Sequence, residues 1–198
     1  MPTQSVPATK ADVSLSFAPV VRSAAPSVVN IYAKRIVAGR PSPFADDPFF
    51  DRLFKEFGAN RPEVQNSLGS GVIVGEDGLV VSNYHVVGMA DEITVVLNDQ
   101  REYRADLMLA DEDSDLAVLR LRDADALPAL SLRDSDQIEV GDLVLAIGNP
   151  FGIGQTVSMG IVSATARSSM AVGNGRGYFL QTDAAINPGN SGGALVDG

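Results

Sequence analysis

The order of three reactive residue types along the chain restricts its fold more than any other feature. A histidine, His85, is followed by a group of aspartates that includes Asp115, and then by a serine, Ser191. Proteins that combine these residues for acyl transfer differ in their order: α/β-hydrolases run serine, acid, histidine, and subtilisins run aspartate, histidine, serine. None of residues 192–198 is a histidine, which excludes an α/β-hydrolase. The observed order favours a chymotrypsin-like fold, in which two β-barrels form one cleft.

Ser191 lies in the run Gly-Asn-Ser-Gly-Gly at residues 189–193. Glycines on both sides permit a tight turn, so the hydroxyl projects and neighbouring N–H groups stay free to bind an anion. Acyl transfer needs an exposed nucleophile and amides aimed at the oxygen that becomes negative. We assign Ser191 as the candidate nucleophile and place the oxyanion hole at Gly189, Asn190 and Ser191, with the Gly189 and Ser191 amides as donors. The alternative is a glycine-rich hairpin with an idle serine.

His85 is the only histidine of the chain, so an imidazole base for Ser191 can only be this residue. A lone histidine is often a hydrogen-bonded structural residue instead. An aspartate that accepts a hydrogen bond from the imidazole would fix its tautomer and stabilise the imidazolium. Asp111, Asp113 and Asp115 compete for this role, and their spacing alone does not separate them.

Composition excludes several classes of function. The chain has 198 residues, 45% hydrophobic residues and a net charge of −10, which argue for a globular protein and against nucleic acid or anionic membrane as the main partner. No run is long enough for a transmembrane helix. Zero cysteines exclude a thiol nucleophile, a disulfide framework and a cysteine-type zinc site. We expect no metal and no cofactor.

The chain divides into two expected barrels. We interpret residues 1–15 as a loose N-terminal arm without a signal peptide, 16–122 as the first barrel carrying His85 and Asp115, 123–135 as a connection, and 136–198 as a second barrel carrying Ser191. A long insertion is expected at 38–66. Within it, Asp47 and Pro48 would start a helix with a stripe of four apolar residues on one face. The stripe consists of Phe50, Leu53, Phe54 and Phe57.

Short apolar runs separated by turn residues predict antiparallel strands. A helix is expected at 16–25, with Ser16 as its capping residue. Tyr103, Ala105, Leu107 and Leu109 alternate with polar residues, which predicts a strand with one wet face. The expected strands are 28–33, 71–74, 79–82, 92–97, 101–109, 115–122, 143–148, 156–164, 178–182 and 193–196.

Four ordered blocks resemble the HtrA family, in particular its bacterial Do-like (DegP/DegQ-type) serine endoproteases. The blocks are Asn-Tyr-His-Val-Val at 83–87, Asp-Ser-Asp-Leu-Ala-Val-Leu at 113–119, Gly-Asn-Pro-Phe-Gly at 148–152, and the segment 182–195 around Ser191. The resemblance spans roughly residues 15–198. It selects Asp115 over Asp111 and Asp113, because Asp115 directly precedes Leu-Ala-Val as in the family triad.

The resemblance also implies a function. It points to an endopeptidase of protein quality control and stress response, located in the periplasm, that cleaves unfolded or misfolded polypeptides and assembles as a homotrimer or higher oligomer. In chymotrypsin-like enzymes the primary pocket lies just upstream of the nucleophile, here at Ala184, Ala185 and Ile186. These uncharged residues predict cleavage after small apolar residues, and we expect Asp183 to be structural. The loops at 148–154 and 167–177 match family loops that switch the oxyanion hole.

The segment after Ser191 is short compared with the family pattern. We expect a second barrel that is incomplete and lacks PDZ domains, so activity of this chain is not assured. The alternative function is therefore a non-catalytic peptide-binding or chaperone-like module, or an inactive fragment, using the same cleft.

Overall fold

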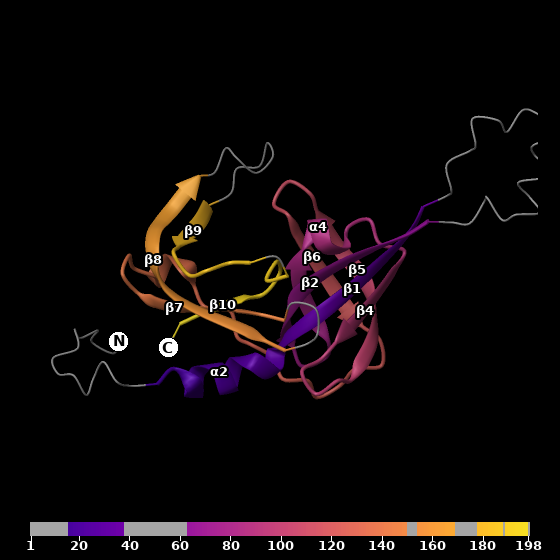
Figure 1. Cartoon of the computed structure of the whole chain (residues 1–198), viewed down its shortest axis with the longest axis horizontal. Helices are drawn as coiled ribbons and strands as arrows, with labels where there is room; N and C mark the ends of the chain where they lie inside the picture. The colour runs from indigo at the N-terminus through magenta and orange to yellow at the C-terminus, as the bar shows by residue number, and fades with distance from the viewer. Residues whose placement is uncertain (1–15, 38–62, 150–153, 169–177, 188, 198) are drawn as a thin grey trace, which may run out of the picture.

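The computed structural model describes residues 16–37, 63–149, 154–168, 178–187 and 189–197, and the structural findings concern these residues. They form a closed six-stranded barrel and a curled four-stranded sheet that lie side by side (Figure 1). The fold is mostly β and chymotrypsin-like, as the chain order predicts. The helix that bears most on packing is α2 (Ala18–Ala24), next to the four-stranded sheet.

The first barrel closes in the strand order β1-β2-β3-β6-β5-β4, with every neighbour antiparallel. Its core consists mainly of β-branched residues and leucines, which suit the pleated surface of a strand. Val29, Ile31, Ile73, Val80 and Leu119 are among those with no exposed surface. The strands are β1 (Val28–Val37), β2 (Glu63–Gly75), β3 (Leu79–Asn83), β4 (Glu92–Val96), β5 (Glu102–Asp111) and β6 (Leu116–Leu121).

The second sheet has the strand order β10-β7-β8-β9. Its strands are β7 (Leu143–Gly148), β8 (Thr156–Ser168), β9 (Tyr178–Thr182) and β10 (Ala194–Val196). Leu145 and Ile147 of β7 pack with Ala24 of α2 and Val28 of β1, so a second core joins the helix and the start of the first barrel to this sheet. A largely apolar hollow of about 780 Å³ lies between the two sheets, lined by residues of α2, β2, β3 and β10.

Two expected boundaries need correction. The N-terminal helix begins at Ala18, with Phe17 at the N-cap position, although the Ser16 hydroxyl does accept a hydrogen bond from the Ala18 amide at 3.2 Å. Strand β2 begins at Glu63 and pairs with β1 from there, so residues 63–66 belong to a strand and not to the insertion. The helix expected within 47–57 lies outside the described residues.

The alternation expected along β5 is wrong beyond its middle. The pairing of β5 with β6 shifts register between Leu107 and Leu109, as in a β-bulge. An extra residue in one strand interrupts the two-residue period, so the side chains no longer alternate between core and solvent. Ala105 is buried as expected, whereas Leu109 is 63% exposed.

In the part of the chain that the structure describes, no helix is long and apolar enough to cross a membrane.

Candidate active site

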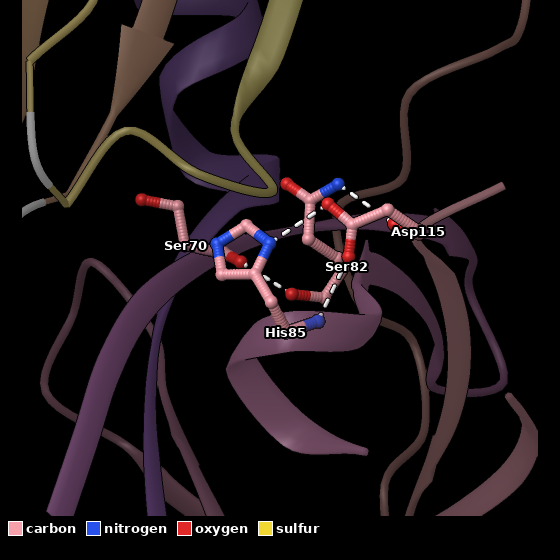
Figure 2. Close-up of polar contacts among 5 residues, drawn as sticks. Ser70, Ser82, His85 and Asp115 are labelled. Carbon is pink, nitrogen blue, oxygen red and sulfur yellow. Dashed lines mark hydrogen bonds and ion pairs between the residues drawn. The ribbon is translucent and has the colours of Figure 1, made fainter. Parts of the chain in front are cut away.

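The side chains of His85 and Asp115 point toward each other (Figure 2). His85 lies in the short helix α4 (Tyr84–Val87), directly after β3, and Asp115 lies in the turn before β6. Strands β3 and β6 are paired up to Asn83 and Leu116, which brings the residues that follow and precede them together. The Asp115 carboxylate accepts from the His85 backbone amide at 2.8 Å, and its other oxygen lies 2.7 Å from His85 Nδ1.

The backbone of Asp115 is fixed as firmly as its side chain. Its carbonyl accepts hydrogen bonds from the Tyr84 amide at 3.1 Å and from the Asn83 side-chain amide at 2.8 Å. Its φ of +54° lies in the left-handed region, which aspartate tolerates better than most residues. The carboxylate is therefore aimed at His85 by four contacts with three consecutive residues.

The three competing aspartates have different surroundings. Only Asp115 contacts His85. Asp111 closes the turn that presents Asp115, accepting from the Asp113 amide at 3.1 Å and from the Ser114 hydroxyl at 2.6 Å. The hydrogen bond from the Ser114 hydroxyl lowers the pKa of Asp111 below its ordinary value. Asp113 has an exposed side chain.

Ser191 lies in a tight turn between β9 and β10. Two glycines of this turn have positive φ, +97° at Gly189 and +81° at Gly192, so the sequence needs residues without a Cβ here. The turn is closed by hydrogen bonds from the Asn190 amide to the Asn187 carbonyl at 3.0 Å and from the Gly193 amide to the Asn190 carbonyl at 2.8 Å. The Asn190 amide is thus used within the turn. The Gly189 and Ser191 amides donate to no other described residue.

The turn docks on the first barrel close to the start of α4. The Ser191 carbonyl accepts from the Ser70 amide at 2.8 Å, and the Gly189 carbonyl accepts from the Ser70 hydroxyl at 2.7 Å. Gly192 lies so close to β2 and β3 that a Cβ there would stand 2.6 Å from Ser82 Oγ. The His85 side chain is 56% exposed, and among the described residues no hydrogen bond joins it to the Ser191 hydroxyl. Catalytic hydrogen bonds are often long before a substrate binds.

The expected pocket residues follow β9. Ala184 is buried, whereas Ala185 and Ile186 are exposed, the latter to 65%. Their backbone is held against β8, because the Ser158 hydroxyl donates to the Ala185 carbonyl at 2.6 Å. The Asp183 carboxylate accepts from the Ile161 amide at 2.8 Å, a contact that ties the segment to the sheet.

Ser70 is the functional candidate that sequence reasoning missed. It lies in Gly69-Ser70-Gly71, a serine between two glycines like Ser191 itself. Those glycine neighbours are the signal that could have identified it. A Cβ at Gly69 would lie 2.7 Å from a Val86 side-chain carbon, so the chain passes unusually close to α4 there.

Comparisons with known proteins identify the family of the chain. Residues 69–198 match the family model of the trypsin-like peptidase domain. A probable periplasmic serine protease do/HhoA-like of Haemophilus influenzae is 45% identical over 194 residues, which cover 92% of this chain and 41% of that protein. The periplasmic pH-dependent serine endoprotease DegQ of Escherichia coli is 41% identical over 187 residues, covering 92% of this chain and 40% of DegQ.

Solved structures give the same result. The HtrA-type protease AlgW with decapeptide is 45% identical with a TM-score of 0.73, covering 92% of this chain and 56% of that chain. The present chain spans about two fifths of the length of the curated relatives named above. The fold, the paired His85 and Asp115, and these similarities together establish that the chain belongs to the HtrA family of trypsin-like serine proteases.

Proposed function

We propose that this protein is a serine endopeptidase in which Ser191, His85 and Asp115 form the catalytic triad. The observation that carries the proposal is the double contact of the Asp115 carboxylate with His85, at 2.8 Å to its amide and 2.7 Å to its ring. A carboxylate accepts hydrogen bonds only, so the Nδ1 atom carries the proton and Nε2 is the free base. An imidazole held in this tautomer is what an acyl-transfer enzyme needs.

The reaction would follow from this arrangement. The Ser191 hydroxyl attacks the carbonyl carbon of the scissile peptide while His85 Nε2 takes its proton. The tetrahedral intermediate collapses when the C–N bond breaks and the imidazolium gives the proton to the leaving amine. Water then repeats the sequence on the acyl-enzyme, releasing the new carboxyl terminus and restoring Ser191.

The Gly189 and Ser191 amides would stabilise the negative oxygen of the intermediate. Both lie on the turn that carries the nucleophile, and neither donates to another described residue. Removing one donor of such a site typically costs about 10²-fold to 10³-fold in rate. The amide of Asn190, which donates to Asn187, would support the turn and not the oxyanion.

The substrate would be a polypeptide with a small apolar residue before the cleaved bond. The segment upstream of Ser191 carries no charge at Ala184, Ala185 and Ile186. The carboxylate of the neighbouring Asp183 accepts a hydrogen bond from the Ile161 amide. We propose unfolded or misfolded proteins as substrates, the periplasm as location, and a homotrimer or higher oligomer as the working assembly. Relatives named as periplasmic serine proteases support the proposed location.

Labelling with a fluorophosphonate tests the proposal directly. The probe phosphonylates an activated serine, so the wild-type chain should be labelled and Ser191→Ala should not. Ser163→Ala is a suitable control, because it removes another serine hydroxyl of the second sheet, on strand β8. Absence of Ser191-dependent labelling in folded protein would favour a peptide-binding module that uses the same cleft.

A further inference from the structure

Ser70 is a buried polar junction between the two barrels. It lies in β2 with no exposed surface, and its backbone amide, carbonyl and hydroxyl are all hydrogen-bonded across strands or between barrels. The amide and hydroxyl donate to the Ser191 turn, the hydroxyl accepts from Asn149, and the carbonyl accepts from Ser82. A side chain buried this completely contributes to function only through the groups it holds.

The contacts of Ser70 fix two peptide groups of the turn at residues 189–193 that carries Ser191, here called the nucleophile turn. Its amide binds the Ser191 carbonyl at 2.8 Å, and its hydroxyl binds the Gly189 carbonyl at 2.7 Å. These carbonyls belong to the 189–190 and 191–192 peptide groups. The 190–191 peptide group, which contains the Ser191 amide, lies between these two peptide groups. Rotation of that peptide group would break the hydrogen bond that the Asn190 carbonyl accepts from the Gly193 amide at 2.8 Å, while the Ser70 contacts hold the peptide groups on either side.

The hydroxyl of Ser70 has a defined direction. The Asn149 amide, at the end of β7, donates to Ser70 Oγ at 2.9 Å. Because one lone pair is used by this donor, the hydroxyl proton is free to point at the Gly189 carbonyl. A hydroxyl group that both accepts and donates is polarised, which strengthens both of its hydrogen bonds. The end of β7, strand β2 and the nucleophile turn are therefore connected through one oxygen atom.

We infer that Ser70 is a positioning residue, whose hydroxyl holds the nucleophile turn in the conformation that directs the Gly189 and Ser191 amides at the oxyanion. The inference depends on the proposed proteolytic function and adds a residue to it. Ser70 does not touch the substrate. Its contribution should appear in the transition state, since the ground-state peptide makes weaker demands on the oxyanion donors.

Kinetics of Ser70→Ala, normalised by active-site titration, test the inference. This variant retains the backbone contacts to Ser191 and Ser82 and loses only the hydroxyl. We expect kcat to fall about 10-fold to 100-fold per active site, less than for loss of a donor itself. KM should change less than about twofold, because uniform binding is not affected. Binding of a peptide boronate, whose adduct places an oxygen in the oxyanion hole, should weaken by a factor similar to the fall in kcat/KM.

Two comparisons separate positioning from a general loss of stability. Ser27→Ala removes another buried serine hydroxyl, just before β1 and, among the described residues, without a hydrogen bond to the Ser191 turn, and should retain most of kcat per active site. Ser70→Thr and Ser70→Val have the same shape and differ only in the hydroxyl, so the threonine variant should be the faster by about 10-fold or more.

Equal kcat per active site for the threonine and valine variants would overturn the role of Ser70, as would boronate binding unchanged in Ser70→Ala. These results, which would overturn only the role of Ser70, differ from the results expected if the protein were not a protease. In that case the wild-type chain itself would show neither fluorophosphonate labelling nor boronate binding that depends on Ser191.

Discussion

Asp115 binds His85 twice, through the backbone amide and through the ring, so one carboxylate sets both the position of the residue and the orientation of its imidazole. The first contact explains why the short helix α4 begins where it does. The second leaves Nε2 as the only ring nitrogen available to a hydroxyl. Position and tautomer are thus separable properties of the same pair, and substitution can test them separately.

Asp115→Asn tests the tautomer. The side-chain oxygen of asparagine can still accept from the His85 amide, and asparagine tolerates the φ of +54° found here. Its amide group would donate to Nδ1 and so force the proton to Nε2. We expect kcat to fall roughly 10⁴-fold with little change in the unfolding midpoint. Measured kcat and thermal unfolding of the same preparation decide this, and a loss below about tenfold would contradict the assignment of Asp115.

Asp111→Ala tests the turn that presents Asp115. The substitution removes the acceptor for the Asp113 amide and the Ser114 hydroxyl. If this loosens Asp115 by about 1 kcal/mol, kcat should fall roughly fivefold. Asp113→Ala is the matched control, since the Asp113 side chain is exposed in the same turn. Equal kcat values for the two variants would show that Asp111 does not support the site.

Gly192→Ala tests the docking of the nucleophile turn. A Cβ at this residue would lie 2.2 Å from the Ser70 carbonyl oxygen, and the φ of +81° is already strained for alanine. The turn must move off β2, and a misplacement of about 1 Å can cost about 10²-fold in rate. We expect a loss of at least that size in kcat.

Gly141→Ala is the control for backbone strain alone. Gly141 has a φ of +104°, and a Cβ there meets no atom within 4 Å. The variant should lose about 1 to 2 kcal/mol in free energy of unfolding and keep its kcat per active site. Similar kcat losses in both glycine variants would mean that general destabilisation, not docking on Ser70, affects the rate.

Acid stability of the first barrel should depend on Asp106. The Arg122 guanidinium beside it lowers the pKa of Asp106 below its ordinary value of 3.8. The native state therefore binds fewer protons than the unfolded state, and the contribution of Asp106 to stability is present above pH 3.8 and is lost as pH falls through the lower, native pKa. Because both side chains are largely exposed, the effect should be small.

Urea unfolding of the wild type and of Asp106→Asn over this pH range measures that contribution. The stability difference between the two proteins should shrink as the pH is lowered. In the Asp106→Asn background, Arg122→Gln should have little further effect on the pH dependence. If the stability difference between the wild type and Asp106→Asn stayed constant from pH 7 to the lowest pH measured, the Asp106–Arg122 pair would not contribute to acid stability.

Much of the fold follows from local patterns. Strands β7 and β9 have the residues expected for them, because each is an apolar run with clear turn residues on both sides. Strand β5 differs because a bulge at Leu107–Leu109 depends on its pairing with β6, which lies later in the chain. The N-cap of α2 is Phe17, one position after the predicted Ser16. The exact start of this helix depends on its packing against β7, which lies far along the chain.

The candidate site was only partly predictable. Chain order and glycine chemistry suggest His85 and Ser191 without knowledge of the structure. Spacing could not choose among Asp111, Asp113 and Asp115, since Asp111 ends β5, the other two lie in the turn that follows, and only the folded structure shows that Asp115 faces His85. The glycines on both sides of Ser70 mark a close approach of the backbone, but its partners Gly189 and Asn149 lie 119 and 79 residues away, so local patterns do not reveal what it contacts.

His85 is the only histidine in the 198 residues, and its ring is held by a single carboxylate. Selective isotope labelling of histidine would therefore give an NMR spectrum with one imidazole, already assigned. The Nδ1 proton shared with Asp115 should resonate far downfield. Its chemical shift would report how inhibitor binding or mutation of distant residues changes the hydrogen bond between His85 and Asp115.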